Sequence, residues 1–144
     1  MGYSYQGDNN KTAKALARRE DISRRLARET CTAIKGMKVN DAITYLQKVI
    51  KQEAYVPLKR HNTKQPHRKG GQPGKYPTKS SKIIIKLLNN LKANAQNSEL
   101  NTENLKIVHA TAYKNRIVHR VRPRGKAKSS DIEWTTVELV GKEV

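Results

Sequence analysis

Apolar residues recur at helical spacing in three segments of the chain, and the first segment begins near Ser23. Leu26, Thr30 and Ile34 follow one another at intervals of four, so they share one face of a helix. Ser23 is a residue type that caps helix N-termini, and Gly36 suits the position after the last turn. The pattern predicts a helix between Ser23 and Gly36.

Two further helices are predicted by one-sided apolar stripes farther along the chain. The second helix is capped by Asn40, and its stripe consists of Val39, Ala42, Ile43, Leu46, Val49 and Ile50. The third helix starts within residues 78–81, and its stripe consists of Ile84, Leu87, Leu88, Leu91 and Ala95. Each of these helices therefore has one apolar face.

Strand patterns close the chain and, more weakly, open it. In the first C-terminal strand the residues predicted to share a face are Leu105, Ile107, His109, Thr111 and Tyr113. In the second strand Val137 and Leu139 share one face, while Ile132 and Trp134 fall on the other. This change of face predicts a bulge or a strong twist between Trp134 and Val137. Near the N-terminus, residues 11–20 suggest a short strand and residues 1–10 a flexible arm.

Two segments have no apolar periodicity. Residues 57–77, PLKRHNTKQPHRKGGQPGKYP, contain four prolines and three glycines but no acidic residue. A connection of this length is either disordered or functional. The second segment is the tip of the C-terminal hairpin, residues 121–128, in which basic residues alternate along the chain. A tip of repelling like charges indicates a partner of opposite charge.

The charge of the chain restricts the classes of partner. Thirty basic residues against twelve acidic residues leave a net charge of +18 over 144 residues, a length that suits one domain. So large an excess indicates a polyanion, with nucleic acid as the first candidate. No apolar run is long enough to span a membrane. One cysteine, Cys31, fits a reducing, cytoplasmic location.

Catalytic and metal-binding patterns are weak, so we predict no enzyme, cofactor or metal site. The stretch GGQPGKYPT lacks the spacing of a phosphate-binding loop. One cysteine cannot support a thiolate zinc site with the four histidines. Cys31 lies within an apolar stripe and is interpreted as a core residue. His109 is interpreted as a sheet residue at the core edge, and packing is favoured over base stacking for Trp134.

The first two helices also resemble a helix-turn-helix, which makes a free DNA-binding regulator the alternative function. The second helix would then enter the major groove. However, its first turn carries Asp41, which has the wrong charge for that position, and its lysines come late. The arginines belong to the first helix instead.

The order of these segments resembles a universal ribosomal family, large-subunit ribosomal protein twenty-two, called seventeen in animals and fungi. The stretches that carry the resemblance are KTAKALARRE, AIKGMKVNDAITYLQKVI, VPLKRHN, GKYPTKSSK, LKIVHATAYK and TTVELV, over about residues 3–140. The insertion at residues 57–77 is similar to the archaeal and eukaryotic branch. The tip, RPRGKAK, departs from the usual family pattern by its early Gly125 and by Lys128.

The resemblance implies an α+β fold with three helices packed on a small antiparallel sheet and a long C-terminal β-hairpin extension over residues 105–140. It implies a single domain over residues 1–144 that is monomeric within the large subunit. The implied partners are ribosomal RNA, neighbouring ribosomal proteins and the nascent peptide, which the hairpin tip would meet in the exit tunnel. The residues predicted to line the tunnel are Arg122, Pro123, Arg124, Gly125 and Lys126.

Charge and resemblance together predict an RNA-binding set drawn from the first strand and helix, the loop and the hairpin. Its members are Arg18, Arg19, Arg24, Arg25, Arg28, Lys59, Arg60, His61, Lys64, His67, Arg68, Lys69, Lys75, Tyr76, Lys79, Lys114, Arg116, Arg120, Arg122, Arg124, Lys126 and Lys128. Structured RNA would be bound mainly through phosphates, sugars and shape.

Overall fold

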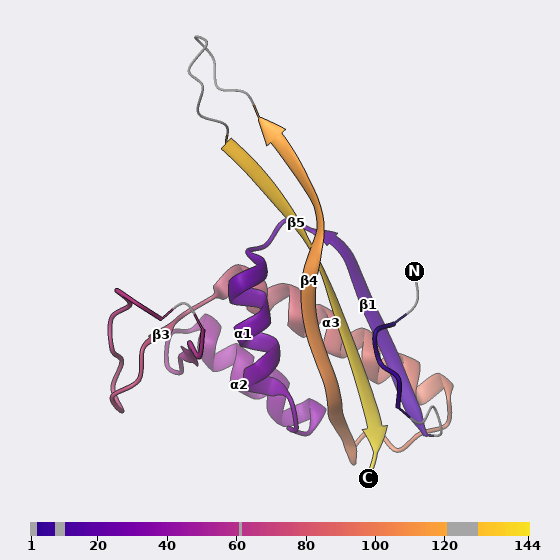
Figure 1. Ribbon diagram of the computed structural model, residues 1–144. Coiled ribbons are helices and arrows are strands. Elements are labelled where there is room, and N and C mark those ends of the chain that lie inside the picture. Colours follow the sequence, from indigo (N-terminus) through magenta and orange to yellow (C-terminus); the bar gives the residue numbers. More distant parts are fainter. Residues whose placement is uncertain (1–2, 8–10, 61, 121–129) are drawn as a thin grey trace.

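A three-stranded antiparallel sheet with the strand order β1-β5-β4 organises the fold. In this computed structural model β1 spans Thr12–Glu20, β4 spans Leu105–Arg120 and β5 spans Ser130–Glu143 (Figure 1). The structure describes residues 3–7, 11–60, 62–120 and 130–144. The strand expected within residues 11–20 is confirmed, and β4 and β5 pair as the predicted C-terminal hairpin.

Three helices lie against one face of this sheet (Figure 1). They are α1, Arg24–Ile34; α2, Val39–Ile50; and α3, Thr78–Asn97. The strands are contacted mainly by α1 and α3, while α2 packs chiefly on α3. A short second sheet pairs β2, Val56–Pro57, with β3, Gly74–Lys75. The predicted α+β fold class is confirmed.

The first two helices begin after the N-cap residues Ser23 and Lys38. Ser23 occupies the N-cap of α1 as predicted, although its side chain makes no capping hydrogen bond. The prediction of Asn40 as the cap of α2 is wrong, because Val39 is fully buried and already takes the first helical position. The Asn40 side-chain oxygen instead accepts a hydrogen bond from Lys92 Nζ at 3.3 Å.

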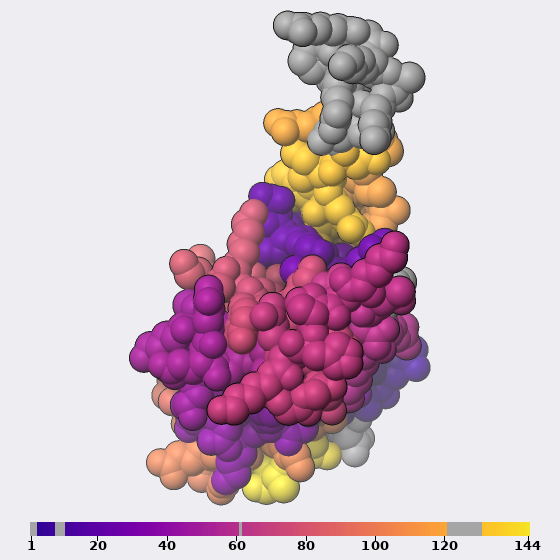
Figure 2. All heavy atoms as spheres, turned by 90° about the vertical axis from the view of Figure 1, so that its left-hand side faces the viewer, coloured from indigo at the N-terminus to yellow at the C-terminus, as the bar shows by residue number. Residues whose placement is uncertain are grey.

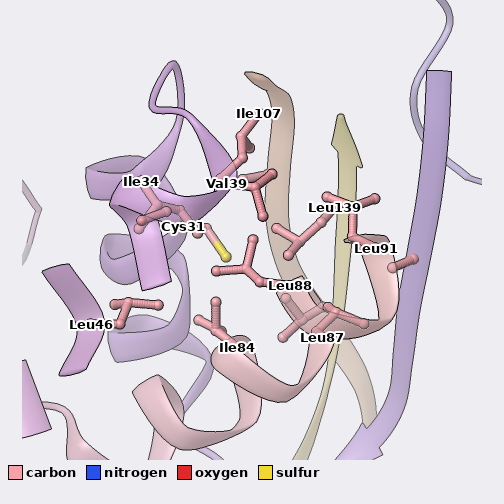
Figure 3. Close-up of a cluster of buried hydrophobic side chains, with 14 of the residues drawn as sticks. Cys31, Ile34, Val39, Leu46, Ile84, Leu87, Leu88, Leu91, Ile107 and Leu139 are labelled. Atoms are coloured by element: carbon pink, nitrogen blue, oxygen red, sulfur yellow. The ribbon is translucent and has the colours of Figure 1, made fainter. Parts of the chain in front are cut away.

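The predicted apolar stripes meet in one core between the helices and the sheet (Figure 3). Ile84, Leu88 and Leu91 of α3 are fully buried and pack in the same cluster as Leu139 of β5. Cys31 of α1 lies in this cluster, and burial raises the pKa of its thiol to about 12. The interpretation of Cys31 as a core residue is confirmed.

A bulge in β4 changes which residues face the core. The pairing of β4 with β5 shifts between Ile107 and His109, so Val108 is an extra residue. Simple alternation would place His109 in the core, but beyond the bulge Ala110 takes that position. The prediction of one shared face is therefore wrong after Ile107. The residues that lie on the opposite face are His109, Thr111 and Tyr113.

A second bulge places Asn115 of β4 opposite the Trp134–Thr135 step of β5. The irregularity predicted between Trp134 and Val137 is confirmed, because the pairing of β5 with β4 shifts opposite Trp134 and Thr135, and its pairing with β1 shifts between Val137 and Thr135. Trp134 is half-buried and pairs across the hairpin with Arg116. It lies outside the core cluster, on the stem of the hairpin.

The N-terminal segment Tyr3–Gly7 packs on the face of the sheet that the helices leave open, so the prediction of a flexible arm is wrong for these residues. Glu138 is fully buried there. Its carboxylate accepts the backbone N–H of Ser4 at 3.2 Å and the Ser4 hydroxyl, and His109 Nε2 lies 2.8 Å from it. The rings of Tyr5 and His109 are 5.7 Å apart.

Among the described residues, no helix is long and apolar enough to cross a membrane.

Candidate nucleic-acid interface

The arginines of α1 differ in what they contact. Arg25 and Arg28 are exposed on the side of the helix away from its apolar core residues. Arg24 forms an ion pair with Glu133 of β5, in which Arg24 Nε lies 2.9 Å from the carboxylate. This ion pair ties α1 to the stem of the hairpin. Arg25 and Arg28 therefore carry the charge that α1 offers to a polyanion.

The basic loop, residues 57–77, has more internal structure than its composition predicts. Its two ends pair as β2 and β3, and the Leu58 N–H donates to the Pro73 carbonyl at 2.9 Å. The Arg68 N–H donates to the Gln72 carbonyl at 2.8 Å, which closes the outer turn. Gly70, with φ 103°, allows the backbone conformation of that turn. The loop is thus a folded extension of the domain.

Glu29 anchors the basic loop to α1. Its carboxylate oxygens accept the backbone N–H groups of Lys59 at 3.0 Å and Arg60 at 3.2 Å. Glu29 is only 6% exposed, and Leu58 beside it is 8% exposed. A buried carboxylate is stable only when such donors satisfy it. Sequence reasoning missed Glu29, because an acidic residue that follows several arginines on a helix is usually solvated.

Three residues of the predicted RNA-binding set take part in contacts within the loop. The guanidinium of Arg68 lies over the Tyr76 ring at 4.8 Å, and its Nε donates to the Gly74 carbonyl at 3.0 Å. His67 Nδ1 lies 3.0 Å from the Gly71 carbonyl oxygen. These contacts give Arg68, Tyr76 and His67 a structural part in the loop.

A cleft of about 270 Å³ lies where α1 meets the basic loop. We call it the basic cleft. It is lined by Ser23, Arg24, Arg25, Leu26, Arg28, Glu29, Leu58, Arg60, Gln65 and Lys75. Figure 2 shows the face of the molecule over which the loop spreads beside α1 and α2. The fold thus brings arginines of α1 together with basic residues some 30 to 50 positions later in the chain.

The remaining predicted residues are spread over other surfaces. Arg18 and Arg19 are exposed where β1 leaves its regular pairing with β5. Lys79 is exposed and pairs with Asp21 at 2.7 Å. The other exposed members of the set in the described part of the chain are Lys59, Lys64, Lys69, Lys114, Arg116 and Arg120. His61, Arg122, Pro123, Arg124, Gly125, Lys126 and Lys128 lie outside the described residues.

The hairpin stem runs beyond the three-stranded part of the sheet. The pairing of β1 with β5 ends at Thr135, while β4 and β5 continue to pair as far as Arg120 and Ser130. The stem carries Arg116 and Arg120 beside the apolar Val118, which is 38% exposed. His119 Nδ1 lies 2.9 Å from the Asp131 carboxylate across the stem.

No cluster able to hold a metal ion occurs within the described ranges.

The fold and the basic cleft together define a small, strongly basic α+β domain with a projecting hairpin. A family model described as Ribosomal protein L22p/L17e matches residues 15–140, so the chain belongs to this family. The family consists of structural ribosomal proteins rather than enzymes, in agreement with the prediction from the sequence. Membership also sets aside the alternative of a free DNA-binding regulator.

Curated relatives match over nearly their whole length. The large ribosomal subunit protein uL22 of Methanocella arvoryzae is 41% identical over 149 residues, covering 100% of this chain and 97% of the relative. The uL22 of Archaeoglobus fulgidus is 42% identical over 146 residues, covering 97% and 94%. The uL22 of Methanocaldococcus jannaschii is 41% identical over 142 residues, covering 96% and 91%. These relatives are archaeal, which confirms the predicted branch.

Proposed function

We propose that this chain is a structural component of the large ribosomal subunit in the cytoplasm, where it binds ribosomal RNA as a monomer beside neighbouring ribosomal proteins. The observation that carries the RNA-binding part is the basic cleft, in which arginines of α1 and of the loop gather around one hollow. Gathering these charges costs repulsion in the free protein, and a polyanion removes that cost. The names of the archaeal relatives support the large subunit as the site of assembly.

We further propose that the hairpin extends into ribosomal RNA and that its tip lines the nascent-peptide tunnel. The stem beyond β1 adds six residues of β4, residues 115–120, or about 20 Å at 3.3 Å per residue. A two-stranded ribbon is marginally stable in water by itself. Surrounding RNA would supply the contacts that an exposed stem lacks. The tunnel role rests on the resemblance and on the charge of residues 122–128.

Co-sedimentation with ribosomal subunits tests the proposal. A tagged chain expressed in an archaeal host should migrate with the large subunit and remain there after a wash in moderate salt, because many contacts with RNA and neighbouring proteins act together. It should be absent from the small-subunit fraction. Sedimentation as a free protein, or release at moderate salt, would contradict assembly into the subunit.

A further inference from the structure

We propose that the basic cleft holds a single unpaired nucleotide of the ribosomal RNA, with its base on Leu26 and Leu58 and its phosphate on Arg28 and Arg60. This inference rests on the proposed RNA-binding function and adds the kind of RNA element that the cleft receives. It distinguishes the cleft from the exposed cations elsewhere on the chain, which would meet phosphates along the outside of an RNA duplex.

The size of the cleft favours one nucleotide. At about 270 Å³ it falls just below the range of roughly 300–1,000 Å³ that is usual for pockets holding drug-sized ligands. An RNA duplex lies on a surface and cannot enter a hollow of this size. An unpaired nucleotide can leave the stack and place its base in such a hollow, which is how most sequence-specific RNA recognition works.

The lining has the two chemistries that a nucleotide needs. Leu58 is 8% exposed and Leu26 is half-buried, and both line the hollow, where they supply apolar surface. Arg28 and Arg60 are exposed and also line the hollow, and a guanidinium can hold phosphate with paired donors. A site for phosphate alone would need the arginines but not the leucines.

Gln65 adds a group that can read a base edge. It is half-buried in the lining, and its amide offers both a donor and an acceptor. Lys75 completes the charged rim from β3. The N-terminus of α1 opens on the same hollow, and the side chain of Ser23 makes no capping bond there. The free N–H groups of a first helical turn favour an anion such as a phosphate.

Glu29 is the one acidic residue of this lining, and its contacts explain why it does not repel a phosphate. Both carboxylate oxygens face the backbone N–H groups of Lys59 and Arg60, at 3.0 and 3.2 Å. Its charge is therefore directed into the loop. The same bonds fix the backbone of Arg60 beside α1, so Arg60 and Arg28 line one hollow.

Titration of the full-length, isotopically labelled chain with small probes tests the site directly. The probes are AMP, GMP, CMP and UMP, with inorganic phosphate and the four nucleosides as comparisons. At least one monophosphate should shift the backbone amides of Leu26, Leu58 and Gln65 in a saturable way, and should bind about tenfold more tightly than inorganic phosphate. Equal affinity for phosphate and for all four nucleotides would overturn the inference.

Variants assign the effect to the cleft. The double change R28A/R60A should weaken binding of the monophosphate about tenfold or more, since two charge-assisted hydrogen bonds are lost. L26S should lower nucleotide affinity severalfold while leaving inorganic phosphate unchanged. The matched control is K82A/K86A, which removes two exposed charges from α3 away from the cleft and should leave nucleotide affinity the same.

Large subunits assembled with each variant provide the second measurement. Acylation of RNA 2′-hydroxyl groups should increase at one discrete nucleotide with R28A/R60A and with Q65A, but not with K82A/K86A. Intact assembly with no such change would overturn the nucleotide site and leave the proposed function standing. Failure of the unmodified chain to bind ribosomal RNA would instead contradict the proposed function itself.

Discussion

Two buried carboxylates, Glu29 and Glu138, organise a chain in which basic residues dominate. Each is satisfied by backbone N–H groups or hydroxyls contributed by a segment that would otherwise have little to hold it. Glu29 binds the basic loop, and Glu138 binds the segment that contains Ser4. Burial makes an unsatisfied carboxylate costly, so each acid enforces one position of its segment.

Replacing Glu29 with Gln should weaken RNA binding even though it makes the chain more positive. The amide oxygen can accept only one of the two N–H groups, and the amide nitrogen faces the other donor. We expect the free energy of unfolding to fall by about 1.5–3 kcal/mol and the loop amides to exchange faster. Urea unfolding, hydrogen exchange and filter binding to ribosomal RNA measure these effects.

The matched control for this change is Glu53→Gln, at an exposed acidic residue outside the loop. It adds the same charge and should strengthen RNA binding slightly or leave it unchanged. If both variants bind RNA more tightly, charge alone governs affinity, and Glu29 does not position the loop.

Acid should release the N-terminal segment from the sheet. Burial by itself raises the pKa of Glu138, but hydrogen bonds from Ser4 and His109 outweigh this effect and hold the pKa below its ordinary value of 4.5. A group with a lowered folded pKa contributes stability above its unfolded pKa and loses that contribution as pH falls through the folded pKa. We therefore expect the segment to stay docked at neutral pH and to detach below about pH 4.5.

The Ser4 amide and His109 ring resonances report this transition in a pH titration followed by NMR. Glu138→Gln should abolish the transition in this acid range, because no carboxylate remains to titrate. A transition of unchanged midpoint in that variant would show that another group controls the segment.

At the scale of the element, α1 should act as a phosphate-binding helix through Arg25 and Arg28. Each single change to Ala should lower the slope of log K against log salt by somewhat under one unit, from about 0.7–0.9 per phosphate contact. Arg24→Ala should have a smaller effect on the slope, because Glu133 already pairs with Arg24. Filter binding at several salt concentrations gives the slopes. A loss of affinity confined to one RNA sequence, with unchanged slope, would indicate base readout by these arginines.

The basic loop is held to the domain by few contacts compared with the helices. Its outer turn around Gly70 and Gly71 is exposed and has no apolar stripe to bury. We expect limited trypsin digestion to cut the free protein first at Lys64 or Lys69, and the cut to disappear in assembled subunits. Glu29→Gln should accelerate the cut in the free protein. Equal cleavage of the free and assembled protein would show that RNA does not cover the loop.

For the whole molecule, the hairpin tip should influence what passes the tunnel more than whether the subunit forms. The core lies between the helices and the sheet, far along β4 and β5 from residues 121–129. Removing residues 122–128 and closing the hairpin with Asn-Gly therefore leaves the core unchanged. We expect this variant to enter large subunits, while nascent-chain stalling or sensitivity to tunnel-binding antibiotics changes.

Pull-down of tagged subunits and translation in a cell extract separate the two outcomes. Circular dichroism of the isolated variant provides the folding control. A variant that folds but does not enter subunits would make the tip an assembly anchor first, and would reduce the tunnel role to a secondary one.

Periodicity was enough to predict the three helices, because a helix that packs by one face must repeat its apolar residues every three or four positions. Ile84, Leu88 and Leu91 illustrate this, and all three are fully buried. Charge was enough to predict the basic surfaces, since thirty cations cannot be hidden in a chain of this length. Residues such as Arg25 and Arg28 are exposed as expected.

Only the tertiary structure decided which contacts join distant segments. The bulge at Val108 reverses the face of His109, and alternation along one strand cannot reveal it, because a bulge is set by pairing with the neighbouring strand. Burial of Glu29 and Glu138 likewise depends on donors that arrive from elsewhere in the chain. The sequence by itself determined the three helices, the three long strands and the sign of the surface charge, since these follow from local pattern and composition. The tertiary structure decided the cleft, since its walls come from segments that meet only after folding.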